Sequence, residues 1–211
     1  MTTQFYLIRH GETAWNAEKK LQGWQNIALN ETGLQQAESL QDYLASETFT
    51  AHIDRLISSD LRRAADTARI ATRHWGLPIE MTESLRERGF GIAEGQSWAA
   101  VGQPDQPSDK NADIDASPQG GESLRVFQAR VLSAFEELAA KHRGLNLMVF
   151  AHGGVIDQVW RKLNQLSLWE PRTQTIFNTS INHFSIDPQG TWTIEHWGQL
   201  PHLDTALDEA P

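Results

Sequence analysis

The chain has 211 residues, of which 39% are hydrophobic and 21% are charged, as is ordinary for one globular domain. It contains no cysteine, which excludes disulfides, thiol catalysis and thiolate metal sites. Its net charge of −9 disfavours binding to nucleic acid or anionic membranes. Neither a signal-peptide pattern nor an apolar run of about 18 residues is visible, so we expect a cytoplasmic protein.

The first apolar segments predict a strand followed by a helix. A short strand covers residues 4–8 and is broken by Gly11. Asn30 is the expected N-cap of a helix, because a side-chain amide oxygen can accept a hydrogen bond from the free N–H groups of the first turn. The predicted apolar stripe of this helix consists of Leu34, Ala37, Leu40 and Leu44.

A second strand and helix follow in the same order. The strand is expected over residues 55–58, and Ser59 or Asp60 is the expected helix cap. The buried face of the helix is predicted to contain Leu61, Ala65, Ala68 and Thr72. Glycine and proline within residues 76–78 end it, and residues 79–81 predict an edge strand.

The middle of the chain begins with a different composition. Residues 102–121 are rich in proline, aspartate and serine and predict a long surface loop. A helix is expected next, with the apolar stripe Leu124, Phe127, Val131, Ala134 and Leu138. Residues 145–150 form a continuous apolar run, which is typical of a strand buried on both faces. Another helix is predicted over residues 155–163.

Two strands are expected near the end of the chain, over residues 176–186 and 191–197, joined by a turn at 187–190. The polar tail over residues 200–211 is predicted to wrap the surface. This alternation of strands and helices indicates an α/β fold in which a mostly parallel sheet carries helices on both faces. We expect residues 1–211 to form one domain.

Two predicted strands end in a histidine followed by glycine. His10 follows Arg9 directly, and His152 follows the apolar run of the later strand. Ligands in open α/β sheets bind beyond the carboxyl ends of the strands, so we expect both histidines at one edge of the sheet. Gly11 and Gly153 would let the backbone approach an anion closely.

Other interpretations of these residues are weaker. A single histidine near a strand end is usually structural, but a matched pair beside an arginine is not typical of that role. A zinc site would need a third ligand such as Glu12, and Arg9 would oppose the cation. A calcium loop over residues 109–120 fails because Ile114 and Gly120 occupy positions that require glycine and glutamate.

Six short segments together resemble the histidine phosphatase superfamily, which is also called the phosphoglycerate-mutase-like family. They are Arg9-His10-Gly11-Glu12-Thr13 with Asn16, Leu21-Gln22-Gly23, Ser58-Ser59-Asp60-Leu61-Arg62-Arg63, Leu85-Arg86-Glu87-Arg88, Gly121-Glu122-Ser123 and Ala151-His152-Gly153-Gly154. They span roughly residues 5–155 in the order that the family has.

The resemblance implies a role for each of five catalytic residues. His10 would be the nucleophile that takes a phosphoryl group, and Arg9 and Arg63 would clamp the phosphoryl oxygens. His152 would donate to the transferring group from the opposite side. Glu87 would protonate the leaving alkoxide and then remove a proton from the attacking water.

The same resemblance implies substrate-binding roles for Asn16, Gln22, Gly23 and Gly153, with no metal and no cofactor. Two arginines are adjacent in the third segment, and the spacing of that segment favours Arg63 over Arg62 as the arginine that clamps the phosphoryl oxygens. Tryptophans close to these segments are candidates for lining the substrate pocket. They are Trp15, Trp24 and Trp98.

The expected reaction is hydrolysis of a small-molecule phosphomonoester. A mutase would need further cations for a carboxylate and a second phosphate, yet Lys110 is the only Lys or Arg between Phe90 and Leu124. A phosphoglycerate mutase using the same phosphohistidine is the alternative, and a catalytically silent phospho-ligand-binding protein is a more distant one.

Overall fold

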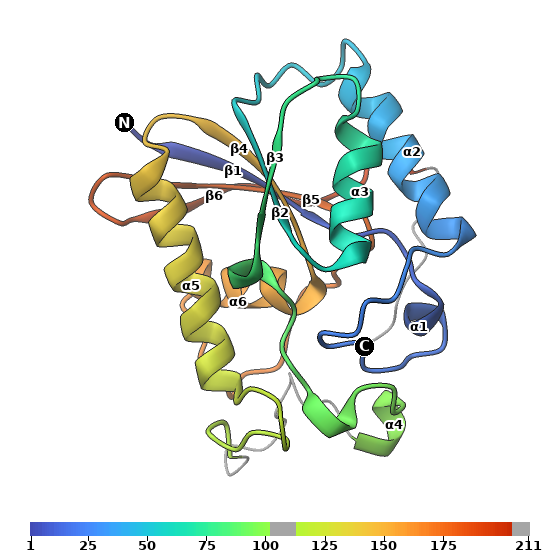
Figure 1. Ribbon diagram of the computed structural model, residues 1–211. Coiled ribbons are helices and arrows are strands. Elements are labelled where there is room, and N and C mark those ends of the chain that lie inside the picture. The colour runs from blue at the N-terminus through green and yellow to red at the C-terminus, as the bar shows by residue number, and fades with distance from the viewer. Residues whose placement is uncertain (102–112, 204–211) are drawn as a thin grey trace.

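The computed structural model describes residues 1–101 and 113–203, and one six-stranded sheet runs through it. Its strands are β1 (Thr3–Arg9), β2 (Arg55–Ser59), β3 (Ile79–Thr82), β4 (Asn146–Ala151), β5 (Ile181–Ile186) and β6 (Trp192–Gln199). They lie in the order β3-β2-β4-β1-β5-β6 (Figure 1). The pairings from β3 to β1 are parallel, and β5 is antiparallel to both of its neighbours.

Helices cover both faces of this sheet (Figure 1). One face is covered by α2 (Glu31–Ala45) and α3 (Arg62–Thr72), and the other by α5 (Leu124–Lys141) and α6 (Gly153–Leu163). The predicted α/β fold with a mostly parallel sheet is therefore confirmed.

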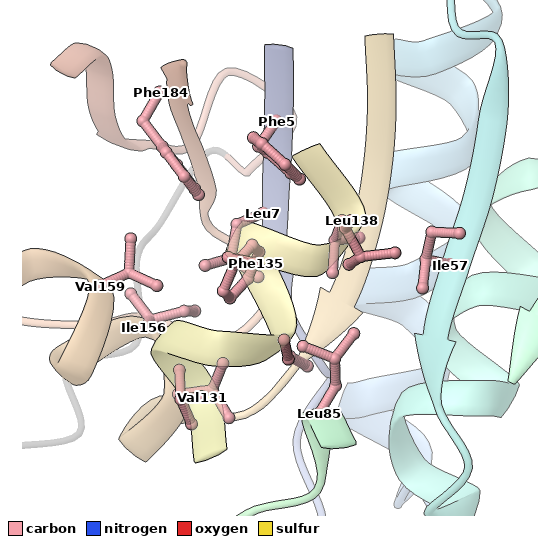
Figure 2. Close-up of a cluster of buried hydrophobic side chains, with 14 of the residues drawn as sticks. Phe5, Leu7, Ile57, Leu85, Val131, Phe135, Leu138, Ile156, Val159 and Phe184 are labelled. Carbon is pink, nitrogen blue, oxygen red and sulfur yellow. The ribbon is translucent and has the colours of Figure 1, made fainter. Parts of the chain in front are cut away.

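The central strands supply side chains to two hydrophobic cores. Alternate residues of a strand face opposite sides, so Leu7 packs under α5 and α6 whereas Ile8 packs under α2 and α3. Figure 2 shows the first core, in which Phe135 of α5 meets Phe5 and Phe184 from the sheet. Burial on both faces explains why β4 has a continuous apolar sequence.

Short elements extend beyond the carboxyl ends of the parallel strands. They are α1 (Ala14–Ala17) after β1, and η1 (Glu83–Leu85), η2 (Gly91–Ala93) and α4 (Trp98–Val101) after β3. An isolated bridge between Lys20 and Ser97 joins these two segments. The edge of the sheet that carries both histidines is thus surrounded by irregular chain.

Several sequence predictions need correction at the ends of elements. Leu34 is 44% exposed, because the buried stripe of α2 turns instead through Gly33, Gln36, Ala37, Leu40 and Leu44. The residue at the N-cap of α3 is Leu61, not Ser59 or Asp60, and it makes no side-chain cap. The Asn30 cap of α2 is confirmed by a hydrogen bond that its Oδ1 accepts from the N–H of Gly33.

The late strand predicted over residues 176–186 begins only at Ile181. Thr179 has a φ of 57°, a left-handed conformation that interrupts an extended strand and is unusual for a β-branched residue. Its N–H donates to the carbonyl of Arg9, so this segment crosses the end of β1. Residues 102–112 of the predicted loop and 204–211 of the tail lie outside the described residues.

Candidate active site

The two histidines lie next to each other because β1 and β4 are parallel neighbours in matched register. Arg9 is paired with Ala151, so the residues that follow them, His10 and His152, leave the sheet side by side. Their ring centroids are 5.2 Å apart and both rings are buried. The structure therefore brings together the pair that the two His-Gly sequences predict.

The hydrogen bonds of His10 define its tautomer. Its Nδ1 lies 2.7 Å from the carbonyl oxygen of Gly11, which can only accept, so Nδ1 carries the proton. Its Nε2 accepts a hydrogen bond from Nε of Arg63 at 3.3 Å. The acceptor for Nδ1 is thus the backbone carbonyl of the next residue, and the electron pair of the neutral ring lies on Nε2, where it accepts from Arg63.

Burial keeps both histidines neutral. It lowers the pKa of His10 well below the usual value, and the Arg63 and Arg9 guanidinium groups lower it further. The pKa of His152 is lowered well below the usual value by burial and then by Arg63. An uncharged imidazole is the form of histidine that can act as a nucleophile.

Arg63 is fixed by the loop that follows α1. It lies on the first turn of α3, is 1% exposed, and donates to the carbonyls of Gly23 and Gln25 at 2.9 and 3.0 Å. Burial lowers the pKa of Arg63 to about 10, and the nearby Glu87 carboxylate opposes that shift, so the guanidinium remains charged at neutral pH. Arg62 instead points to solvent and pairs with Asp66, as expected for the neighbouring arginine.

Arg9 reaches the site from the last position of β1. Its Nη1 donates to the carbonyl of Ile176, in the segment that crosses the end of that strand. A Cβ on Gly153 would lie 3.5 Å from Nε of Arg9, so the guanidinium packs against the start of α6. Both arginines are therefore held by backbone groups beside the two histidines.

His152 is the N-cap residue of α6, and its ring is completely buried. Its Nε2 lies 2.8 Å from Oγ of Ser59 at the end of β2. Its Nδ1 is buried and has no hydrogen-bond partner within residues 1–101 and 113–203. That nitrogen is the group of His152 to which a ligand could bind.

Glu87 lies in the segment between η1 and η2, and two backbone N–H groups bind its carboxylate. Oε1 accepts from the N–H of Arg88 at 2.9 Å, and Oε2 accepts from the N–H of Gly154 at 3.0 Å. A Cβ on Gly154 would lie only 2.2 Å from Oε1. The second glycine after His152 is therefore needed for the approach of Glu87 to the start of α6.

Three of the four predicted substrate-binding residues lie in the chain after β1, and the fourth, Gly153, begins α6. Asn16 forms a capping box with Thr13, in which its Oδ1 accepts two hydrogen bonds, so only its amide nitrogen could donate to a phosphoryl oxygen. Gln22 is 7% exposed, and its Oε1 has no hydrogen-bond partner in the described part of the chain. Gly23 contributes the carbonyl that holds Arg63.

The three tryptophans lie in this region but differ in their contacts. Trp24 is 41% exposed, and its indole N–H donates to the carbonyl of Glu87 at 2.8 Å. Trp98 packs edge-on against Phe90. The ring of Trp15 covers Gly95. Trp24 therefore directly contacts a predicted catalytic residue.

Sequence reasoning missed the residues that support the site from later in the chain. The buried Asn178 donates from Nδ2 to the carbonyl of His10 at 2.8 Å, and Ile176 provides the acceptor for Arg9. The sequence places both residues in a regular strand, in which their backbone groups would form hydrogen bonds within the sheet. The positive φ of Thr179 is not encoded by a glycine, so no local signal reveals the turn.

Comparison with known proteins gives one consistent result. The profile of the histidine phosphatase superfamily (branch 1) matches residues 5–200. Phosphoglycerate mutase-like protein 4 of Arabidopsis thaliana is 35% identical over 207 residues, covering 95% of this chain and 87% of that protein. The metal-independent phosphoserine phosphatase of Arabidopsis thaliana is 33% identical over 210 residues, covering 96% and 84%.

A solved structure agrees with these relatives. Bacillus stearothermophilus YhfR has a TM-score of 0.80 and 30% sequence identity, covering 95% of this chain and 98% of that one. Within the described residues, no helix is long and apolar enough to cross a membrane, and no three His, Asp or Glu side chains are grouped so that they could hold a metal ion.

Proposed function

Because the chain belongs to the histidine phosphatase superfamily (branch 1), we propose that it hydrolyses a small-molecule phosphomonoester through a phosphohistidine on His10. One observation carries the proposal. Nε2 of His10 holds an electron pair and lies against Arg63, inside a buried group that also contains His152 and Arg9. This arrangement combines a nucleophile with charges of the sign that a phosphoryl group requires.

In the first step Nε2 of His10 attacks phosphorus as the bond from phosphorus to the leaving oxygen breaks. Arg9 and Arg63 stabilise the charge on the phosphoryl oxygens, and His152 donates to the same group. Glu87 enters this step as the protonated acid and gives that proton to the leaving alkoxide, which departs as an alcohol and leaves Glu87 as a carboxylate. Glu87 then takes a proton from the water that attacks the phosphohistidine, releasing phosphate and regenerating His10.

The charge distribution supports an anionic substrate in spite of the net charge of −9. Two guanidinium groups lie beside His10, and both histidines are uncharged. Phosphoryl transfer depends mostly on positioning and charge stabilisation, so two arginines can take the place of a metal ion. We therefore propose that catalysis needs no metal.

Activity toward p-nitrophenyl phosphate tests this mechanism. His10→Ala should lower kcat by about 10³-fold or more, because it removes the nucleophile. His74→Ala, at an exposed histidine in the turn after α3, is the control and should leave kcat unchanged. EDTA should not alter the wild-type rate. An active His10→Ala variant would contradict the phosphohistidine, and loss of activity in EDTA would contradict the metal-free mechanism.

A mutase is the second candidate, since one relative is named as phosphoglycerate mutase-like. The scarcity of Lys and Arg between Phe90 and Leu124 favours hydrolysis. Incubation with 3-phosphoglycerate and its bisphosphate primer separates the two reactions. We expect released phosphate to exceed 2-phosphoglycerate. Efficient interconversion with little free phosphate would assign the mutase reaction instead.

A further inference from the structure

Arg130 of α5 binds the backbone of the segment that carries Glu87. Its Nη1 donates to the carbonyls of Ser84 and Arg86 at 3.0 and 2.9 Å, and its Nη2 donates to the carbonyl of Glu87 at 3.2 Å. These three carbonyls lie just after β3, where the chain passes beside α5 (Figure 1). The side chain of Arg130 thus fixes the path of the backbone from Ser84 to Glu87.

Glu122 completes this contact from the residue before the N-cap of α5. Its two carboxylate oxygens accept from Nε and Nη2 of Arg130 at 2.8 and 2.7 Å. Its Oε2 also accepts from the N–H of Gly89 at 3.0 Å. The pair therefore binds the Glu87 segment by its carbonyls on one side and by an N–H on the other.

The geometry of this pair requires an arginine. The guanidinium makes five hydrogen bonds to four residues, and the side chains of Arg130 and Glu122 are only 21% and 13% exposed. A lysine has three donors on one atom and cannot span these acceptors. An ion pair with this geometry and this degree of burial contributes more to fixing the positions of the groups it binds than to the free energy of folding.

From these contacts we infer that Arg130 and Glu122 are positioning residues for Glu87, the general acid of the proposed reaction. They fix the backbone of Glu87 while the N–H groups of Arg88 and Gly154 orient its carboxylate. The side-chain hydrogen bonds described for both residues go to the Glu87 segment or join the two residues, and the charge of Arg130 also lowers the pKa of the nearby His152. The inference rests on the proposed function, since it assigns their effect to protonation of the leaving group.

Leaving-group dependence tests this role. p-Nitrophenolate leaves readily without a proton, whereas an alkoxide requires an acid. Arg130→Met should therefore lower kcat/KM for an alkyl monoester such as glycerol 2-phosphate by about tenfold more than for p-nitrophenyl phosphate. Arg125→Met is the matched control, because Arg125 lies on the same helix with a 59% exposed side chain paired to Asp115. It should change neither rate.

Glu87→Gln measured in parallel separates the two hypotheses. It should show the same selectivity more strongly, by about 10²-fold, and Arg130→Met should add little selectivity in the Glu87→Gln background. If Glu87→Gln is selective and Arg130→Met lowers both rates equally, the positioning role is wrong and the proposed mechanism stands. If Glu87→Gln itself shows no selectivity, the acid role of Glu87 is wrong and the inference falls with it.

A milder variant covers the case in which Arg130→Met does not fold. Glu122→Gln keeps the size of the side chain and one oxygen that can accept a hydrogen bond from Arg130. It removes the negative charge that orients the guanidinium. We expect the same direction of selectivity with a smaller ratio, about threefold. If Glu122→Gln changes kcat/KM for both substrates by the same factor, or changes neither, the proposed role of the Arg130–Glu122 pair is wrong.

Discussion

At the scale of single residues, the protonation of His10 follows from backbone and arginine contacts. A carbonyl accepts at Nδ1 and a guanidinium N–H donates at Nε2, so the ring presents its electron pair on one side only. The sequence predicts the histidine and its arginines. It could not predict the acceptor, since every residue has a carbonyl and only the turn at Gly11 directs this one toward the ring.

Arg63 should not tolerate replacement by lysine. An ammonium group cannot donate to Gly23, Gln25 and His10 from the planar fork that these contacts require. We expect Arg63→Lys to lower kcat for p-nitrophenyl phosphate by about 10²-fold, with a small change in the free energy of unfolding.

The control for this change is Arg62→Lys, because Arg62 is the neighbouring arginine and its exposed side chain pairs with Asp66. Its kcat should equal that of the wild type. Near-wild-type kcat for Arg63→Lys would show that a point charge is sufficient and that the fork has no catalytic value.

At the scale of elements, the loop over residues 22–25 is held by one carboxylate from a distant segment. Glu94 accepts from the N–H of Trp24 and of Phe90 at 3.0 and 3.1 Å and from the side chain of Gln25 at 2.8 Å. A Cβ on Gly23 would overlap this carboxylate, so glycine with its positive φ is required there. The loop thereby places the carbonyls that bind Arg63.

Glu94→Ala should therefore weaken catalysis through Arg63. We expect kcat/KM for p-nitrophenyl phosphate to fall by about tenfold in the wild-type background and by much less when Arg63 is already lysine. Glu47→Ala, at an exposed residue after α2, is the control. Equal losses in both backgrounds would show that Glu94 acts on general stability and not on the arginine.

Elements defined by a long periodic pattern were predictable, and short irregular ones were not. The stripe from Leu124 to Leu138 predicts α5 because the helix buries each of those residues. Residues 176–180 look like a strand, but their hydrogen bonds go to Arg9 and His10 at the end of β1. Such non-local contacts override local propensity and leave no pattern in the sequence.

At the scale of the whole molecule, histidines whose pKa is lowered in the folded protein couple stability to pH, and they include the buried His10 and His152 and the partly buried His202. Burial lowers the pKa of His10 and His152 well below the usual value and lowers that of His202 to about 4. Above about pH 6.5 these imidazoles are neutral in both the folded and the unfolded chain. Below it, the unfolded chain takes up protons that the folded protein does not.

The free energy of unfolding should therefore fall as the pH decreases from about 6.5 to 5, with up to about 1.4 kcal/mol per pH unit for each histidine. Urea denaturation across this range measures the slope. His202→Gln should make the slope shallower. His52→Gln, at a side chain that is 84% exposed, should leave it unchanged. A flat profile for the wild type would contradict the neutral buried histidines.

The register of β1 against β4 has an evolutionary consequence. It sets the two histidines side by side, whereas Trp24 and the Glu87 segment, which would face the leaving group in the proposed reaction, belong to irregular chain outside the sheet. Insertions in that irregular chain leave the strand pairing untouched. Selection can therefore change which alcohol is released while the reacting centre is inherited intact, and exchange of such segments between relatives is a practical route to new substrate preferences.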